Sequence, residues 1–470
     1  MIRAVAISLF ALIPALRAEG DWPQFRGPNA RGVSETTGLP VEFGPEKNVV
    51  WKTELPPGHS SPVLSADRIF VTAFDADNLY VITMDRATGR ILWRRALPRA
   101  RKQELHKSNS PASPSVATDG TNAYAFFTDF GLVSYGSDGQ ERWRVPLGPF
   151  NNPFGMGASP ILVDGKVIQV CDSESGSFII AVDQKTGRTA WRGDREEMTR
   201  GFSTPVLYKP AEGGWQALVA GRNTLMAYDV ASGKKVWWVR GLTWQMKPTP
   251  VVEGDTAYVL GWAGGSDQGN QESLPLFAQA LREMDANGDG RFSKGELAAE
   301  AQKDFKEGDL NRDGFWDERE WEMYRGRRAS VNSVMAVKLG GSGDMTEKSV
   351  SWRYYKSLPN VPSPLLYQGV LYLMKEGGIL TALDPATGAL VKQGRLKGAL
   401  DFYYSSPVGA DGKIFTASQE GHVSVIRAGR EWEVLAVNVM DDEVYATPAP
   451  VDGRLYVRTR SALYCFGVKE

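Results

Sequence analysis

The chain is poor in the residues from which covalently linked or metal-centred scaffolds are built. Its 470 residues include two cysteines, Cys171 and Cys465, and three histidines, His59, His106 and His422. Two cysteines exclude a disulfide-dense scaffold and a cysteine-based zinc or iron–sulfur cluster within the chain. An excess of one charge is also lacking, because 54 lysines and arginines balance 55 aspartates and glutamates. A net charge of -1 gives no general attraction to nucleic acid or to anionic membranes, so neither partner is expected.

Long apolar runs are scarce outside the first 18 residues. There, Arg3 precedes an apolar stretch from Ala4 to Leu16, and Ala18 follows. A short positive start, an apolar stretch and a small residue are typical of a secretory signal peptide. The stretch is shorter than the ~20 residues that span a bilayer. We therefore predict a signal peptide at residues 1–18, export to the periplasm or beyond the cell, and no transmembrane segment. The alternative is a buried N-terminal helix, and the cleavage site stays open.

A repeat of about 45 residues organises the rest of the chain. A step of serine, threonine or alanine and proline, followed by two short β-rich runs, recurs at Pro62, Pro114, Pro160, Pro205, Pro250, Pro364, Pro407 and Pro448. The gaps between successive prolines are 52, 46, 45, 45, 114, 43 and 41 residues. The discordant gap equals one repeat plus an insertion of roughly 70 residues. Runs such as LYVITM and FIIAV have strand patterning, so each unit predicts four short antiparallel strands.

The second half of most units combines a turn with a tryptophan. In three units an Asp-x-x-Thr/Ser-Gly sequence precedes the tryptophan, with the pairs Asp85 and Trp93, Asp183 and Trp191, and Asp229 and Trp237. The aspartate carboxylate bonds backbone amides of the turn, and the glycine accepts a positive φ. We interpret each tryptophan as a wedge between neighbouring sheets that buries ~150–250 Å².

The two ends of the repeat region complement each other. The eighth unit stops before its tryptophan strand, and such a strand, NVVWKTEL around Trp51, is present near the start. Eight radially arranged sheets cover each other's apolar faces. We therefore predict an all-β, eight-bladed β-propeller formed by residues 48–264 and 331–470, closed by its N-terminal strand and preceded by an extension at 19–47. A linear solenoid, the alternative, should carry capping units at its ends.

These units resemble the quinoprotein-like (PQQ-repeat) propeller family, whose blades carry an Ala-x-Asp-x-x-Thr-Gly-x-x-x-Trp docking motif. Residues 181–191 and 227–237 fit it closely, whereas the sixth unit keeps Asp384 and Gly388 but has Lys392 in place of the tryptophan. The resemblance covers residues 48–470 apart from the insertion. It implies an eight-bladed ring, in a family that includes quinone-dependent dehydrogenases and cofactor-free scaffolds such as an outer-membrane assembly propeller. The opening DWPQFRGPNARGVSETTGLP is similar to that of exported bacterial propellers.

The insertion, residues 265–330 in blade five, contains two sequences that match the twelve-residue EF-hand loop, DANGDGRFSKGE at 285–296 and DLNRDGFWDERE at 309–320. Calcium takes six to eight oxygen ligands, and each loop supplies such a set. The expected ligands of two Ca²⁺ sites are Asp285, Asn287, Asp289, Arg291 (through its carbonyl), Ser293 and Glu296 in the first loop, and Asp309, Asn311, Asp313, Phe315 (through its carbonyl), Asp317 and Glu320 in the second.

The residues around the two loops predict a small helical EF-hand pair. Phe292 and Trp316 are placed for a short β pairing between the loops, and apolar residues at helical spacing lie before the first loop and between the two. Calcium outside the cytoplasm is often high and steady, so we expect it to order the insertion rather than act as a switch. Two acidic surface turns without calcium are the alternative.

An active site is not evident from the residues. By resemblance, a dehydrogenase of this family would have adjacent cysteines, a funnel calcium held by Glu and Asn, and a catalytic aspartate. Cys171 and Cys465 are 294 positions apart, so an adjacent pair is impossible. Pyrroloquinoline quinone (PQQ) is thus possible but not supported by a motif. His59 is read as part of a strand entry, His106 as lying in a surface loop or a loop over the funnel mouth, and His422 as exposed.

The residues favour an exported, monomeric, calcium-binding propeller that acts as a binding or scaffolding module without catalysis. Its expected ligand is a protein or a carbohydrate on a propeller face, and the segment 149–157 with 201–203 is the place to look for it. The alternatives are a PQQ-dependent or other oxidoreductase that uses the central funnel, and a hydrolase with paired funnel carboxylates. Catalytic and cofactor-binding residues stay unassigned.

Overall fold

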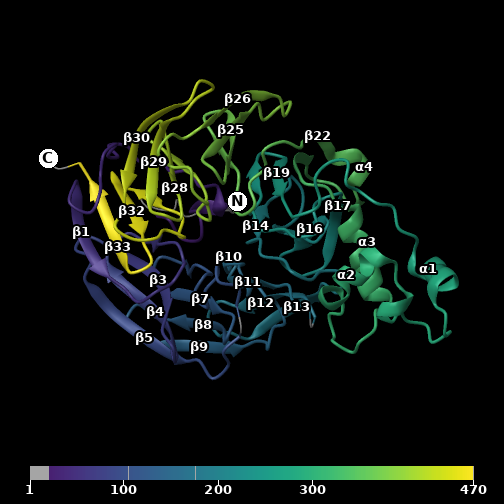
Figure 1. Ribbon diagram of the computed structural model, residues 1–470. Coiled ribbons are helices and arrows are strands. Elements are labelled where there is room, and N and C mark those ends of the chain that lie inside the picture. The colour runs from purple at the N-terminus through teal and green to yellow at the C-terminus, as the bar shows by residue number, and fades with distance from the viewer. Residues whose placement is uncertain (1–20, 104, 175, 469–470) are drawn as a thin grey trace, which may run out of the picture.

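The computed structural model describes residues 21–103, 105–174 and 176–468, so the predicted signal peptide lies outside the described residues. The chain forms the predicted all-β, eight-bladed β-propeller, in which eight antiparallel sheets surround a central axis (Figure 1). In seven blades the first strand in the sequence is the innermost and the next strands follow outward in order, whereas in blade eight β1 (Val49–Glu54), from the start of the repeat region, is the outermost strand. Neighbouring strands are antiparallel, so the start of the innermost strand of a blade and the end of the next strand outward lie on the same face of the ring. We call this the upper face.

The first four blades follow one another without interruption. Blade one contains β2 (Val63–Leu64), β3 (Arg68–Phe74), β4 (Asn78–Asp85) and β5 (Ile91–Pro98). Blade two contains β6 (Ala117–Thr118), β7 (Ala123–Phe127), β8 (Gly131–Tyr135) and β9 (Glu141–Pro146). Blade three contains β10 (Ile161–Val163), β11 (Lys166–Cys171), β12 (Phe178–Asp183) and β13 (Thr189–Asp194). Blade four contains β14 (Val206–Tyr208), β15 (Gln216–Gly221), β16 (Thr224–Asp229) and β17 (Lys235–Arg240), with β21 (Gly343–Asp344) at its edge.

The remaining blades include the insertion and the closure of the ring. Blade five contains β18 (Val251–Glu253), β19 (Thr256–Gly261), β20 (Ser333–Lys338) and β22 (Val350–Tyr354), with helix α4 (Thr346–Ser349) before β22. Blade six contains β23 (Leu365–Tyr367), β24 (Val370–Lys375), β25 (Ile379–Leu383) and β26 (Leu390–Arg395). Blade seven contains β27 (Val408–Ala410), β28 (Lys413–Ala417), β29 (His422–Arg427) and β30 (Glu433–Val439). Blade eight contains β31 (Ala449–Val451), β32 (Arg454–Arg458), β33 (Ala462–Gly467) and β1 (Val49–Glu54).

The ring closes by pairing the two ends of the repeat region. Strand β1 runs antiparallel to β33, with Trp51 opposite Cys465, and Figure 1 shows the purple β1 beside the yellow β33. Trp51 then packs against Gly89 of blade one, and its indole N–H donates to the carbonyl of Arg86 at 3.2 Å. Closure therefore uses the same tryptophan contact that joins blades elsewhere in the ring.

The predicted wedge role of the tryptophans is confirmed at several blade junctions. Each indole N–H donates to a carbonyl in the Asp-x-x-Thr/Ser-Gly turn, or its counterpart, of the following blade: Trp93 to Ser137, Trp143 to Gln184, Trp191 to Val230 and Trp352 to Pro385, at 2.9–3.1 Å. The turn glycine packs directly against the indole, and glycine is required there because any side chain would overlap the indole. At blade six the replacement Lys392 reaches the carbonyl of Trp432 at 3.0 Å and lies over that ring.

The insertion between β19 and β20 is helical and leaves the ring on the upper face. It contains α1 (Phe277–Met284), the short η2 (Lys294–Glu296), α2 (Ala299–Gly308) and α3 (Glu318–Ala329). Its own apolar cluster includes Ala280, Phe292, Trp316 and Trp321. Phe292 and Trp316 form an antiparallel bridge with N–H to carbonyl distances of 2.9 and 2.8 Å, as predicted. Of the helices described, none has the length and hydropathy that a membrane crossing requires.

The N-terminal segment, residues 21–48, runs across the lower face and closes the axis there. Trp22 pairs with Leu64 of blade one, and the Asn29 side chain exchanges hydrogen bonds with Leu207 of blade four. Near the short helix η1 (Pro28–Ala30), the Arg26 guanidinium donates to the carbonyl of Pro364 in blade six at 2.7 Å. The segment thus ties together inner strands on opposite sides of the ring, which the sequence did not predict.

Candidate functional site

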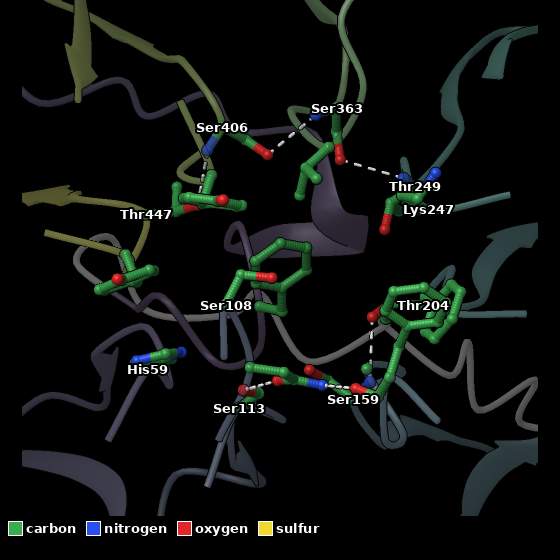
Figure 2. Close-up of a pocket in the computed structure, with 18 of the residues that line it drawn as sticks. His59, Ser108, Ser113, Ser159, Thr204, Lys247, Thr249, Ser363, Ser406 and Thr447 are labelled. Atoms are coloured by element: carbon green, nitrogen blue, oxygen red, sulfur yellow. Dashed lines mark hydrogen bonds between the residues drawn. The ribbon is translucent and has the colours of Figure 1, made fainter. Parts of the chain in front are cut away.

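A ring of buried hydroxyl groups surrounds the propeller axis. It is formed by the residue two positions before each innermost strand, namely Ser61, Ser115, Ser159, Thr204, Thr249, Ser363, Ser406 and Thr447. The backbone N–H of one member donates to the hydroxyl of the next at 2.9–3.0 Å, and such bonds join most neighbours (Figure 2). The recurring step before proline therefore has a second role besides starting a strand. It aligns the blades around the axis.

The second unit begins later than the sequence predicts. The repeat was aligned there on Ser113 and Pro114, but Ser115 occupies the ring position and Val116 takes the place of the proline. Ser113 instead bonds Asn109 within the preceding loop. Serine occurs on both sides of Pro114, so the sequence pattern alone did not distinguish the two registers.

An axial pocket of about 440 Å³ opens above this hydroxyl ring (Figure 2). The loops before the innermost strands line it, and all eight ring residues contribute. Aromatic side chains form two groups in the lining. His59 stacks on Tyr445 with centroids 3.9 Å apart, and Tyr445 stacks on Tyr404 at 5.3 Å. Phe154 meets Phe202 edge to face at 6.1 Å. The segments 149–157 and 201–203 thus contribute to this lining, as expected of a ring face, and the ligand itself stays a prediction.

The pocket is electrostatically one-sided. Lys247 lies in the lining, where its ammonium donates to the carbonyl of Trp262 at 3.1 Å, and burial lowers its pKa to about 7. Burial, together with Arg458 and Arg460, lowers the pKa of His59 to about 3, so this imidazole is neutral near pH 7. Among the described residues no aspartate or glutamate lines the pocket. It therefore offers neither a carboxylate base nor carboxylate ligands for a funnel calcium.

The three histidines have different surroundings. His59 lies just before the innermost strand of blade one, as predicted, and also lines the axial pocket. His106 is exposed at the pocket mouth, so the alternative of a loop over the funnel agrees with the structure. His422 is only partly exposed, because its Nδ1 lies 2.7 Å from the carboxylate of Asp401. No sequence motif marked the first two, since their loops come together only when the ring closes.

The N-terminal segment forms the floor of the pocket. Phe25 is among the lining residues, and the segment that carries it crosses the axis below the hydroxyl ring. Figure 2 shows the purple ribbon of this part of the chain behind the pocket. A ligand therefore enters from the upper face, where the helical insertion also lies.

The first predicted calcium loop is closed by its own carboxylates. Asp285 accepts the backbone N–H groups of Gly288 and Gly290 at 2.8 and 3.0 Å, and Glu296 accepts that of Ala286 at 3.1 Å. Gly290 has the positive φ of +79° that the sharp turn needs. Hydrogen bonds from Ser293 lower the pKa of Glu296, so this carboxylate is ionised at neutral pH. The first and last ligands of the predicted set thus fold back on the same loop.

The second loop repeats this arrangement in a more buried place. Asp309 accepts the backbone N–H groups of Asp313 and Gly314 at 3.1 and 3.0 Å, and Glu320 accepts that of Leu310 at 2.7 Å. Glu320 is only 2% exposed, and its burial raises its pKa. Backbone N–H groups of its own loop thus bond the buried Glu320 carboxylate.

A further cluster of possible metal ligands lies in blade seven. Among the described residues, Asp401, Glu420 and His422 are the group of three acidic, histidine or cysteine side chains whose ligand atoms all lie within 4.8 Å of one another. The carboxylates of the two predicted calcium loops are not gathered that closely. Hydrogen bonds from Ser418 and His422 hold the Asp401 carboxylate in this cluster.

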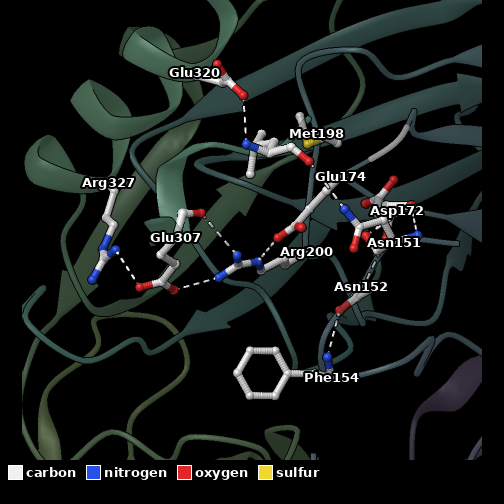
Figure 3. A network of polar contacts seen from close by, with 12 residues as sticks. Asn151, Asn152, Phe154, Asp172, Glu174, Met198, Arg200, Glu307, Glu320 and Arg327 are labelled. Atoms are coloured by element: carbon white, nitrogen blue, oxygen red, sulfur yellow. Dashed lines mark hydrogen bonds and ion pairs between the residues drawn. The ribbon is translucent and has the colours of Figure 1, made fainter. Parts of the chain in front are cut away.

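A chain of ion pairs fastens the insertion to the ring (Figure 3). Arg200, next to the pocket loop that precedes blade four, pairs with the buried Glu174 of blade three and, at 2.6 Å, with Glu307 at the end of α2. Arg327 of α3 joins the same Glu307 at 3.2 Å. Because Glu307 stands two residues before the second loop, the position of that loop is coupled to blade three.

The two cysteines lie in different blades and are unreactive thiols. Cys171 and Cys465 are free and buried, and burial raises the pKa of both thiols. They lie in β11 and β33, where they pack as small apolar residues. This agrees with the sequence interpretation.

Comparisons with known proteins are consistent about the fold. The family model described as "Outer membrane protein assembly factor BamB" matches residues 42–174, 174–274 and 342–470, which leaves out most of the insertion. No curated protein matches the chain. The structure of BamB from Moraxella catarrhalis is 14% identical with a TM-score of 0.54, over 89% of this chain and 99% of that one.

Two enzymes of known structure share the fold as well. A europium-containing methanol dehydrogenase is 10% identical with a TM-score of 0.59, over 96% of this chain and 98% of its own. The quinohemoprotein alcohol dehydrogenase of Comamonas testosteroni is 14% identical with a TM-score of 0.57, over 97% and 82% of the two chains. At these identities the likeness shows the fold alone.

Proposed function

The chain belongs to the family of the outer membrane protein assembly factor BamB, and on this premise we propose that it is an exported, calcium-binding propeller that acts as a binding or scaffolding module without catalysis. The family description supports a scaffold role, because it names an assembly factor rather than an enzyme. The partner is a protein or a carbohydrate held on the upper face. There the axial pocket and the insertion lie on the same side of the ring. The protein acts as a monomer.

The observation that carries this proposal is the axial pocket with no carboxylate in its described lining. An oxidoreductase or hydrolase of the funnel needs a positioned acid or base near the reacting atoms. The groups present instead are hydroxyls, amides, aromatic rings and one lysine, which suit binding and orientation. PQQ with a funnel calcium does not fit this donor set, since its metal would lack acidic ligands. The cysteine pair expected from the dehydrogenases is also missing.

The calcium part of the proposal rests on the two loops of the insertion. The first site would use Asp285, Asn287, Asp289, the Arg291 carbonyl, Ser293 and Glu296, and the second Asp309, Asn311, Asp313, the Phe315 carbonyl, Asp317 and Glu320. Support comes from the backbone-bonded carboxylates of both loops and from the Phe292–Trp316 bridge that pairs them. With calcium bound, residues 265–330 form an EF-hand pair held against blades three and four.

The calcium sites are tested by titrating chelator-treated protein with Ca²⁺ in a calorimeter. Two ions per chain are expected, with Kd no weaker than the ~10⁻⁴–10⁻³ M of extracellular modules. Glu296→Gln and Glu320→Gln should each weaken one site about tenfold or more, because a charged bidentate ligand is lost. Glu300→Gln is the matched control, since Glu300 is exposed on α2 and, in the described part of the chain, forms its ion pair with Lys303. Unchanged binding in the double variant Glu296→Gln/Glu320→Gln would contradict the assignment.

The scaffold reading is tested separately by reconstitution. Protein incubated with PQQ and Ca²⁺ should show neither the absorbance of a bound quinone nor dye-linked oxidation of alcohols or sugars. Stoichiometric quinone binding accompanied by dye reduction would overturn the non-catalytic role and favour the oxidoreductase. The calcium titration would be unaffected by either result.

A further inference from the structure

The axial pocket has more hydrogen-bond donors than acceptors. Seven of the eight axial hydroxyls, all but that of Thr249, accept a backbone N–H from a neighbouring ring residue, and among the described residues none of the eight donates its proton to a protein group. Those protons are free to point into the pocket that the ring lines. A ligand rich in oxygen acceptors therefore suits this end of the pocket.

The Lys247 side chain has no acidic partner in the described part of the chain. Its ammonium bonds only the carbonyl of Trp262 at 3.1 Å and lies 5.9 Å from the centre of that ring. Its two remaining N–H donors have no protein acceptor among the described residues. Since no carboxylate lines the pocket, an anionic group on a ligand is the natural partner of this ammonium.

Two amide side chains in the lining also have free polar atoms. Gln245 is 7% exposed, and its Nε2 has no hydrogen-bond partner among the residues that the structure describes. The Oδ1 of Asn360 is likewise buried and without a partner in that part of the chain. Both residues line the pocket. Because unbonded buried polar groups are costly, a bound molecule that offers both a donor and an acceptor would satisfy them.

The aromatic groups set the shape of the ligand. The stacked set of His59, Tyr445 and Tyr404 presents flat apolar surface, and the Phe154–Phe202 pair presents another. Flat surface beside amides and hydroxyls suits a six-membered ring that is apolar on its faces and polar around its edge. A volume of about 440 Å³ accommodates one or two such rings.

We propose that the axial pocket binds an acidic sugar, a pyranose that carries a carboxylate, with the carboxylate at Lys247. The sugar hydroxyls take the axial hydroxyls, Gln245 and Asn360 as partners, and the face of the sugar ring lies on the aromatic side chains. This site rests on the proposed binding role and names the class of its ligand. It requires neither calcium nor catalysis.

The first test compares three ligands on the calcium-loaded wild-type protein. Binding of glucuronate, glucose and acetate is followed by calorimetry and by the fluorescence of the pocket tryptophan Trp262. Glucuronate is expected to bind at least tenfold more tightly than either glucose or acetate, because only glucuronate offers both the ring and the charge. Equal binding of glucose, or no binding of glucuronate at 10 mM concentration (about the limit of a specific site), overturns the proposal.

The second test places the carboxylate. Lys247→Met keeps the apolar stem, and it should weaken glucuronate at least tenfold and leave glucose unchanged. Lys209→Met is the matched control, because Lys209 is an exposed lysine that also lies over a tryptophan, Trp215 at 5.3 Å, but outside the pocket. Lys247→Arg, which retains the charge, keeps the preference for the acid if Lys247→Met proves unfolded. If folded Lys247→Met binds glucuronate with the same affinity as the wild type, the assignment of the carboxylate to Lys247 is wrong.

The two proposals can fail separately. Loss of glucuronate binding with two calcium ions still bound would overturn the sugar site and leave the calcium propeller intact. A short peptide whose terminal carboxylate competes more strongly than glucuronate would also overturn it, since the sugar ring would then contribute nothing.

Discussion

Replacing Gly89 with alanine tests how the ring is closed. Gly89 has a φ of +73°, and a Cβ there would lie 2.5 Å from the Trp51 ring on the closing strand. The left-handed backbone costs alanine about 1–2 kcal/mol. Displacing the indole adds about 1–3 kcal/mol of overpacking, and loss of its 3.2 Å bond to Arg86 adds about 1 kcal/mol.

The control isolates the contact from the backbone strain. Gly369 has nearly the same φ, +71°, but nothing lies within 4 Å of a Cβ at that position. Gly369→Ala should therefore lose only the strain energy, and Gly89→Ala about 2–4 kcal/mol more. In scanning calorimetry at one heating rate, this difference appears as a Tm lower by several degrees.

A combined variant gives the sharpest outcome. A Cβ at Gly89 would strike the Trp51 ring and, at 2.7 Å, the Thr53 hydroxyl. In a Trp51→Ala/Thr53→Ala background both groups are absent, so Gly89→Ala should then cost no more than Gly369→Ala. Equal Tm losses for the two glycine variants in the wild-type background would refute the reasoning. The closing tryptophan would then not bear on the stability of the ring.

Other consequences follow from the same structure. Lys247→Met should stabilise the protein most below pH 7, because the pKa of Lys247 is about 7 in the folded protein and 10.5 in the unfolded chain. The free-energy penalty of burying the charge is complete below pH 7 and decreases as the pH rises to 10.5. The difference in Tm between variant and wild type should therefore narrow from pH 6 to pH 9, and a constant difference would contradict this. Arg200→Met leaves Glu174 buried without its ion pair and removes the link from Arg200 to Glu307 of the insertion. Chymotrypsin should therefore cleave within 265–330 faster while the blades stay resistant. Cleavage throughout the blades would argue against a separately docked insertion. Removal of calcium by a chelator should produce the same local pattern.

Much of the fold was predictable because its signals are local. A turn such as Asp183–Gly187 fixes its own backbone, and the Trp191 that follows it marks the outer strand, so repetition of this pattern indicates blades regardless of their positions in space. The complementary ends of the chain predicted the closure at Trp51. The loop sequences likewise placed the insertion and the bridge between Phe292 and Trp316. Whether those loops hold calcium stays a prediction.

The candidate site was beyond the sequence because its residues come from all eight blades. The hydroxyl before each proline was visible as a repeat, but its place on the axis, and the choice of Ser115 over Ser113, depend on how the blades are set around the ring. Lys247 and His59 are ordinary residues in ordinary loops until closure brings these loops together. The sequence alone thus determined the blades, because turns and strand pairs arise from neighbouring residues. Only the tertiary structure decided the pocket and its floor, because these arise from contacts across the whole circle.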